Sequence, residues 1–270
     1  TQHRRGYRFI GQDADERSPV PPLRTSYFAP GVVGRDGALA RMHGWLDRML
    51  GGQRQVVFVT GEAGIGKTAL VDTFAGGIVS DLGIRVARGQ CLEQYGTGEA
   101  YLPFLEAIGR LCRDHTQVFD VLRAHAPMWL QQLPSLVSAS EREALGREVL
   151  GASRERMLRE MGDALETLTA DQPLVLILED LHWSDCSTLD LISYVAKQRH
   201  VAQLMLIGTF RTAELHASGN PLKAVTQELL AKQAELAEAG RRVALAGAFL
   251  EEERIRGDRQ PAAAQPEIDQ

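Results

Sequence analysis

Apolar residues along the chain follow two patterns that alternate. Nearly uninterrupted apolar runs, each short enough for one strand, occupy residues 55–60, 174–178 and 204–207. Strands that are apolar at almost every position are covered on both faces, which is typical of a parallel sheet between layers of helices. Elsewhere apolar residues recur every three or four positions, as in residues 39–50, and this spacing predicts helices that bury one face.

Further elements are predicted from weaker patterns. Residues 84–91 have strand composition, and residues 242–246 read as a fifth strand, although their small side chains also permit a helix. Residues 101–168 are predicted to be mostly helical and to be broken by Pro127 and Pro134. This insertion could form a lid or a thick helical layer, and nothing in its residues indicates chemistry.

One stretch carries a specific motif. Residues 61–68 read Gly-Glu-Ala-Gly-Ile-Gly-Lys-Thr and lie between a predicted strand and a predicted helix. They match the phosphate-binding pattern G-x-x-x-x-G-K-[ST] at every fixed position. Its glycines let backbone N–H groups point inward at a helix N-terminus, where the partial positive charge favours phosphate. The predicted nucleotide-binding residues are Gly61, Glu62, Ala63, Gly64, Ile65, Gly66, Lys67, Thr68 and Ala69.

A pair of acids follows the apolar run at residues 174–178. Glu179 and Asp180 would lie at the carboxyl end of a buried strand, beside the phosphate-binding stretch. In such a site Lys67 reaches the β- and γ-phosphates, one acid binds Mg²⁺ and the other orients the attacking water. The residues leave open which acid holds the metal. The predicted Mg²⁺ ligands are therefore Thr68, Glu179 and Asp180.

The order of these features predicts the fold class. The phosphate-binding stretch follows the first predicted strand, and the acids come two strands later. Strands and helices that alternate in this way form a doubly wound parallel α/β sheet, with the ligand at the carboxyl ends of the strands. We therefore expect a three-layer α/β/α P-loop NTPase with a helical insertion.

Three further stretches carry a resemblance. Residues 178–185 read Leu-Glu-Asp-Leu-His-Trp-Ser-Asp, residues 208–211 read Gly-Thr-Phe-Arg, and a Val33-Gly34-Arg35 box precedes the phosphate-binding stretch. Together they resemble the AAA+-related STAND ATPases of bacterial transcriptional regulators. The resemblance implies that Val33, Gly34 and Arg35 line the pocket for the adenine base. It also implies that Arg211 lies near the γ-phosphate, whose oxygens a guanidinium can bind in a bidentate fork.

The two ends of the chain differ in composition from its middle. Residues 3–10 are basic and aromatic, and they resemble the last strand of an OmpR-type winged-helix DNA-binding domain, although Arg5 replaces a glycine of that pattern. A plain cationic arm is the alternative. The expected organisation is the end of a truncated winged helix at 1–11, a proline-rich linker at 12–29, the ATPase domain at 30–248 and a disordered tail at 249–270.

Composition limits which partners, metal sites and cellular compartment are expected. The net charge of −5 argues against non-specific nucleic-acid binding by the whole chain, so we expect DNA binding only through a missing upstream winged helix. Cys91, Cys112 and Cys186 lack paired metal-ligand spacing and predict reduced, buried thiols, and His182 with Cys186 does not suffice for zinc. No apolar run reaches the roughly 20 residues that span a bilayer. We expect a cytoplasmic protein without membrane contact.

The predicted function is that of a nucleotide switch. The resemblance implies ATP binding with slow hydrolysis, ADP in the off state, ATP in the on state and nucleotide-dependent self-association. Asp180, Glu179 and Arg211 are the predicted catalytic residues, and ATP or ADP with Mg²⁺ are the predicted cofactors. A metabolic kinase-like P-loop enzyme and a non-catalytic fragment of a regulator are the alternatives. A GTPase would carry an Asn-Lys-x-Asp motif and a transporter ATPase a Leu-Ser-Gly-Gly-Gln run, and the sequence contains neither.

Overall fold

The computed structural model of the chain describes residues 35–79, 83–93, 99–148, 153–198, 200–216, 220–231 and 242–245. These residues form a five-stranded sheet with the order β2-β3-β4-β1-β5, in which every neighbouring pair is parallel. The strands are β1 (Gln55–Thr60), β2 (Arg85–Gln90), β3 (Leu174–Glu179), β4 (Leu204–Phe210) and β5 (Arg242–Leu245). The predicted parallel sheet is confirmed, and the stretch that also permitted a helix pairs with β1 as a strand.

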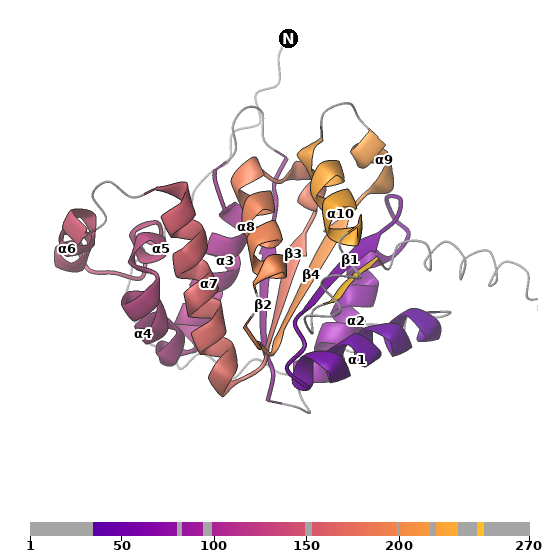
Figure 1. Ribbon diagram of the computed structural model, residues 1–270, viewed down its shortest axis with the longest axis horizontal. Coiled ribbons are helices and arrows are strands. Elements are labelled where there is room, and N and C mark those ends of the chain that lie inside the picture. The colour runs from indigo at the N-terminus through magenta and orange to yellow at the C-terminus, as the bar shows by residue number, and fades with distance from the viewer. Residues whose placement is uncertain are drawn as a thin grey trace, which may run out of the picture.

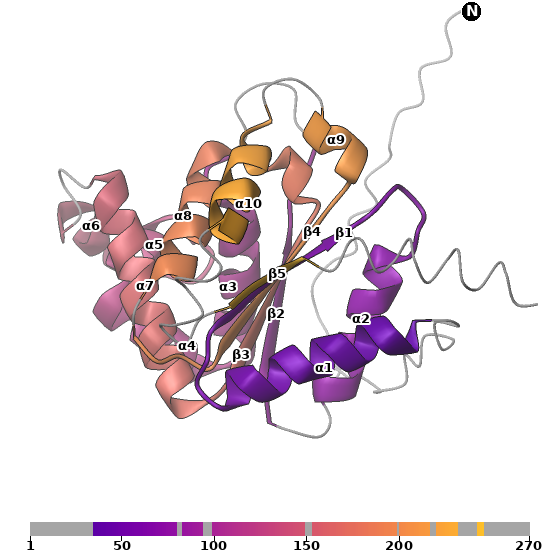
Figure 2. The ribbon, with the colours of Figure 1, turned by 45° about the vertical axis from the view of Figure 1, so that its right-hand side comes forward.

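Helices cover both faces of the sheet. They are α1 (Asp36–Leu50), α2 (Lys67–Val79), α3 (Leu102–Asp114), α4 (Thr116–His125), α5 (Pro127–Gln131), α6 (Ala139–Glu148), α7 (Arg154–Asp171), α8 (Cys186–Lys197), α9 (Thr212–His216) and α10 (Pro221–Ala231), with a 3₁₀ turn η1 (Leu181–Trp183). Helices α1 and α2 lie on one side, and α3, α7, α8 and α10 lie on the other (Figure 1, Figure 2). The predicted three-layer α/β/α fold is therefore confirmed.

The strands divide their side chains between two cores, because successive residues of a strand point to opposite faces. In β3, Val175 and Ile177 join the smaller core beneath α1 and α2. Leu174, Leu176 and Leu178 join the larger core on the opposite face. This alternation fixes which face each residue at the end of the strand approaches.

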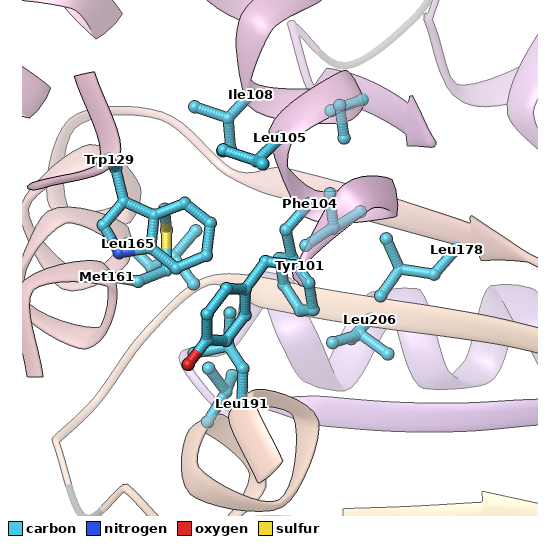
Figure 3. Packing of buried hydrophobic residues seen from close by; sticks show 14 of the residues in the cluster. Tyr101, Phe104, Leu105, Ile108, Trp129, Met161, Leu165, Leu178, Leu191 and Leu206 are labelled. Carbon is cyan, nitrogen blue, oxygen red and sulfur yellow. The ribbon is translucent and has the colours of Figure 1, made fainter. Parts of the chain in front are cut away.

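The helical insertion forms a packed layer on the larger core. Tyr101 and Phe104 pack against Trp129 of α5, with ring centroids 5.0 and 6.4 Å from the indole (Figure 3). Met161 and Leu165 of α7 belong to the same cluster. Of the two forms expected for this insertion, the described residues adopt the thick helical layer.

Some expectations need correction or lie outside the described ranges. The helix that was expected to follow residues 61–68 begins at Lys67, inside that stretch. Cys186 is exposed rather than buried because it is the first residue of α8, whereas Cys91 and Cys112 are buried as expected. Residues 1–34 and 246–270, which include the predicted linker and tail, lie outside the described residues. Among the described residues, no helix is both long and apolar enough to cross a bilayer.

Candidate functional site

The stretch at residues 61–68, called the phosphate loop below, connects β1 to α2 at the carboxyl edge of the sheet. Gly64 and Gly66 adopt φ angles of 76° and 95°, which side chains other than glycine rarely tolerate. The loop therefore needs these glycines to turn into the first residue of α2. Glu62, Ala63 and Gly64 are exposed, so the described residues leave the loop open to solvent.

Lys67 points back into the phosphate loop. Its ammonium group donates hydrogen bonds to the carbonyl oxygens of Gly61 at 2.8 Å and Glu62 at 2.9 Å, and the residue is only 8% exposed. Burial lowers the pKa of Lys67, and the positive charge of Arg211 lowers it further. The charges of Asp180 and Glu62 act in the opposite direction on this pKa. The ammonium group thus interacts electrostatically with Asp180, which follows β3, and with Arg211, which follows β4.

Arg211 follows β4 directly and is half-buried. Within the described part of the chain it forms no ion pair or hydrogen bond, yet its charge affects both Lys67 and His182. Two cations therefore converge at one edge of the sheet without an acid bonded to either. An anion between them would relieve their repulsion.

Asp180 is held by residues from both neighbouring strands. Its backbone adopts the left-handed conformation at φ 56°, which costs a residue with a side chain about 1–2 kcal/mol. Its backbone N–H donates to the hydroxyl of Thr209 on β4 at 3.1 Å. The side-chain amide of Gln90 on β2 donates to its carboxylate at 3.0 Å. These two bonds fix the carboxylate at the end of the sheet.

Glu179 has a different environment from the adjacent acid. Its carboxylate lies 3.8 Å from the guanidinium of Arg88 on β2, and that guanidinium is 2.5 Å from Asp72 on α2. Burial raises the pKa of Glu179, although the charge of Arg88 acts in the opposite direction. Glu179 and Asp180, together with their partners Arg88, Gln90 and Thr209, are called the acidic edge below.

The predicted Mg²⁺ ligands supply a suitable set of donors. Thr68 is exposed in the first turn of α2, and Glu179 and Asp180 offer carboxylate oxygens from the end of β3. Mg²⁺ prefers such oxygens, usually takes one or two carboxylates, and completes its shell with phosphate and water. The described residues contain no group of three His, Cys, Asp or Glu side chains that would hold a metal ion alone. The donors therefore fit a metal ion that arrives with a nucleotide.

Arg35 is the one described member of the predicted base pocket. It precedes α1, is 9% exposed and donates a hydrogen bond from its guanidinium to the carbonyl oxygen of Ile65 at 2.5 Å. The structure thus brings it against the phosphate loop. Val33 and Gly34 lie outside the described residues, so the base pocket stays a prediction.

Sequence reasoning missed three residues of the acidic edge, namely Arg88, Gln90 and Thr209. Gln90 and Arg88 lie on a strand that was predicted, and its carboxyl end must meet the end of β3 in a parallel sheet. A polar residue near the carboxyl end of the predicted strand was therefore a partial signal for Gln90, although the sequence does not show that β2 neighbours β3. Thr209 lay inside the Gly-Thr-Phe-Arg run, but the pattern gave no reason to single out its hydroxyl.

A cavity of about 680 Å³ adjoins this edge beyond η1. Its lining includes Leu92, Pro103, Trp183 and Glu214, and it does not include the phosphate loop. His182 also lines it, and burial lowers the pKa of His182 to about 4. The imidazole is therefore neutral near pH 7, and its ring nitrogens have no hydrogen-bond partner among the described residues.

A known family model covers more than half of the chain. A family model described as AAA ATPase domain matches residues 31–207. No curated protein matches the chain. A structure of Drosophila ORC bound to AT-rich DNA and Cdc6 is similar at 11% identity and a TM-score of 0.37, over 79% of this chain and 58% of that one. Cdc6p from Pyrobaculum aerophilum is similar at 15% identity and a TM-score of 0.40, over 81% of this chain and 52% of that one.

Proposed function

Because the chain belongs to the AAA ATPase domain family, we propose that it is an ATP-binding, slowly hydrolysing switch module. The observation that carries this proposal is the buried Lys67, bonded to the carbonyls of Gly61 and Glu62 in the phosphate loop, with Asp180 and Arg211 directly after β3 and β4 and within its electrostatic influence. Two cations and a carboxylate beside an open phosphate loop suit a nucleoside triphosphate with its metal ion. The chain matches 58% and 52% of the lengths of the two solved structures named above, so any wider activity is also part of the proposal.

We assign the two acids from the faces that they approach. Glu179 continues the side of β3 on which Val175 and Ile177 pack beneath α2, the helix that carries Thr68. Asp180 lies instead within the electrostatic reach of Lys67. We therefore assign Glu179 with Thr68 to the metal ion and Asp180 to the attacking water.

The remaining roles follow from charge and position. Lys67 would exchange its bonds to loop carbonyls for bonds to the β- and γ-phosphates. Mg²⁺ supplies neutralisation of the phosphate oxygens when it is bound. Asp180 would accept a hydrogen bond from the attacking water and orient it, with its own position kept by Gln90 and Thr209. Arg211 would contact the γ-phosphate and so distinguish ATP from ADP.

The regulatory part of the proposal rests on sequence alone. The STAND resemblance supports a role in bacterial signal transduction or transcriptional regulation, with self-association that depends on the bound nucleotide. A switch of this kind moves only by the difference in nucleotide affinity between its two states. Contact with DNA would come through an upstream winged helix, of which residues 3–10 would be the end. We place this activity in the cytoplasm.

Binding of ATP is tested by thermal unfolding. Native-state binding must raise the stability of the chain, by about 2.7 kcal/mol when the ligand is at 100 times its dissociation constant. We expect Mg²⁺–ATP and Mg²⁺–ADP to raise the unfolding temperature and Mg²⁺ alone to leave it almost unchanged. Equal unfolding temperatures with and without Mg²⁺–ATP at millimolar concentrations would contradict the proposed function.

A further inference from the structure

The guanidinium of Arg88 stands between two carboxylates from different elements. It lies 2.5 Å from the carboxylate of Asp72 and 3.8 Å from that of Glu179. The Asp72 side chain is 41% exposed, whereas the Glu179 side chain is only 12% exposed. The shorter contact is therefore to the acid that water screens more strongly. The more buried acid keeps only a loose contact with its nearest cation.

This arrangement bears on the proposed metal ligand. Glu179 is more buried than an ordinary surface carboxylate, so its negative charge needs a nearby cation. Arg88 can supply that charge while no metal ion is present. A divalent ion at the same carboxylate would lie close to the guanidinium and be repelled by it. The two cations therefore compete for one acid.

Asp72 can weaken this competition. It lies on α2 rather than on either strand, and it holds the guanidinium at the shorter of the two distances. Without Asp72, the remaining acid in contact with Arg88 would be Glu179, since these are the two ion pairs that Arg88 makes among the described residues. The charge of Asp72 raises the pKa of Glu179 directly, and its close contact with Arg88 gives it a second route to the metal ligand.

We propose that Arg88 is a positioning residue that competes with Mg²⁺ for the carboxylate of Glu179, and that Asp72 sets the strength of this competition by holding the guanidinium. The inference rests on the proposed function, because it needs Glu179 to bind a metal ion that arrives with the nucleotide. It adds that the chain tunes its own dependence on Mg²⁺ through two residues that touch neither nucleotide nor metal.

The test measures how much Mg²⁺ strengthens ADP binding. ADP is titrated calorimetrically into the whole chain with excess Mg²⁺ and with EDTA, and the ratio of the two affinities is the Mg²⁺ effect. Arg88→Gln should increase this ratio by about three- to tenfold, since one positive charge near the metal is lost. Asp72→Asn should decrease the ratio by a similar factor, because Arg88 then pairs with Glu179.

The double variant separates this mechanism from simple loss of charge. If Asp72 acts through Arg88, adding Asp72→Asn to Arg88→Gln should leave the ratio at the Arg88→Gln value. If Asp72 attracts Mg²⁺ by its own charge, the second substitution lowers the ratio in either background, and that result overturns the proposal. Arg88→Lys keeps the charge and should stay within about twofold of wild type.

Arg154→Gln is the matched control. Arg154 pairs with Asp190 between α7 and α8, with both side chains partly exposed as in the pair of Arg88 and Asp72. It should leave the Mg²⁺ effect unchanged. A wild-type chain that binds no ADP contradicts the proposed function and this inference together. Normal wild-type binding with a ratio that Arg88→Gln and Asp72→Asn both leave unchanged overturns this inference alone.

Discussion

The phosphate loop lies in one stretch of the chain, whereas the acidic edge gathers side chains from three strands. In the loop, Lys67 bonds to carbonyls five and six residues away. At the edge, Asp180 is held by Gln90, which lies 90 residues earlier, and by Thr209, which lies 29 residues later. A local motif therefore specifies the first region, and the sheet order specifies the second.

The difference predicts how each region responds to substitution. Under the proposed function, residues of the phosphate loop would act directly on the nucleotide, so single changes there should remove binding. Residues of the acidic edge act on one another as well, so changes there should separate binding from hydrolysis.

Lys67→Ala should remove detectable binding of Mg²⁺–ATP, and hydrolysis with it. Within the described ranges the ammonium group bonds to loop carbonyls alone, so its loss should leave the sheet and its cores intact. Equilibrium titration measures the affinity, and circular dichroism checks the fold. Lys197→Ala is the control, because this lysine pairs with Glu228 at the surface of α8. The Lys197→Ala variant should bind ATP as the wild type does. Retained affinity in Lys67→Ala would remove the basis of the phosphate-loop assignment.

Substitution of the two acids should give different results. Asp180→Asn should leave ATP binding nearly intact and slow hydrolysis by about 10²–10⁴-fold, the range for a general-base group. Glu179→Gln should weaken binding mainly when Mg²⁺ is present, because it removes the proposed metal ligand. Phosphate release and nucleotide titrations measure both quantities. Equal and mild effects of the two substitutions on both quantities would argue against the acid assignments.

Arg211→Ala should affect ATP more than ADP. A charge-assisted contact with the γ-phosphate exists only with ATP and contributes roughly 1.5–3 kcal/mol. At 1.4 kcal/mol per decade, ATP affinity should fall about tenfold or more while ADP affinity stays nearly constant. Removing Arg211 also removes a positive charge that lowers the pKa of Lys67. ATP and ADP are each titrated against the wild type and against Arg211→Ala. Equal affinities in all four titrations would make Arg211 an ordinary surface residue.

The contrast also explains how far the sequence alone predicts this molecule. The apolar runs at 174–178 and 204–207 predicted central strands, because burial on both faces leaves no polar alternation, and the structure has β3 and β4 there. The loop motif identified Lys67 because its spacing is local. The roles of Arg88 and Gln90 were not predicted, because they depend on β2 lying beside β3. The two strands are far apart in the sequence, so the sequence does not show that they are neighbours.

The packing of the helical insertion was also only partly predictable from the sequence. Its spacing predicted helices, but it did not decide between a lid and a layer. That choice depends on Tyr101, Phe104 and Trp129 meeting in one cluster against the sheet, which is a contact between separate helices. Periodicity indicates which face of a helix is buried, and it does not indicate what covers that face.

Gln90→Ala tests the smallest expected effect and bears most directly on the contrast. Gln90 should not touch the nucleotide, and its amide instead donates to the carboxylate of Asp180 from the neighbouring strand. A hydrogen bond to a charged group contributes about 1.5–3 kcal/mol when buried, and this one is exposed, so we expect about a three- to tenfold loss of hydrolysis rate. ATP affinity should stay within about twofold of wild type, because the phosphate loop is unchanged.

The control for this change is Gln132→Ala, directly after α5, where the side-chain amide donates a hydrogen bond to the sulfur of Met157 and to no other described residue. It should leave hydrolysis unaffected. In an Asp180→Asn background, Gln90→Ala should have almost no further effect, because residues that act through one group are not additive. A full additional loss in that background would mean that Gln90 acts on hydrolysis without Asp180. The acidic edge would then not be a single unit assembled across strands.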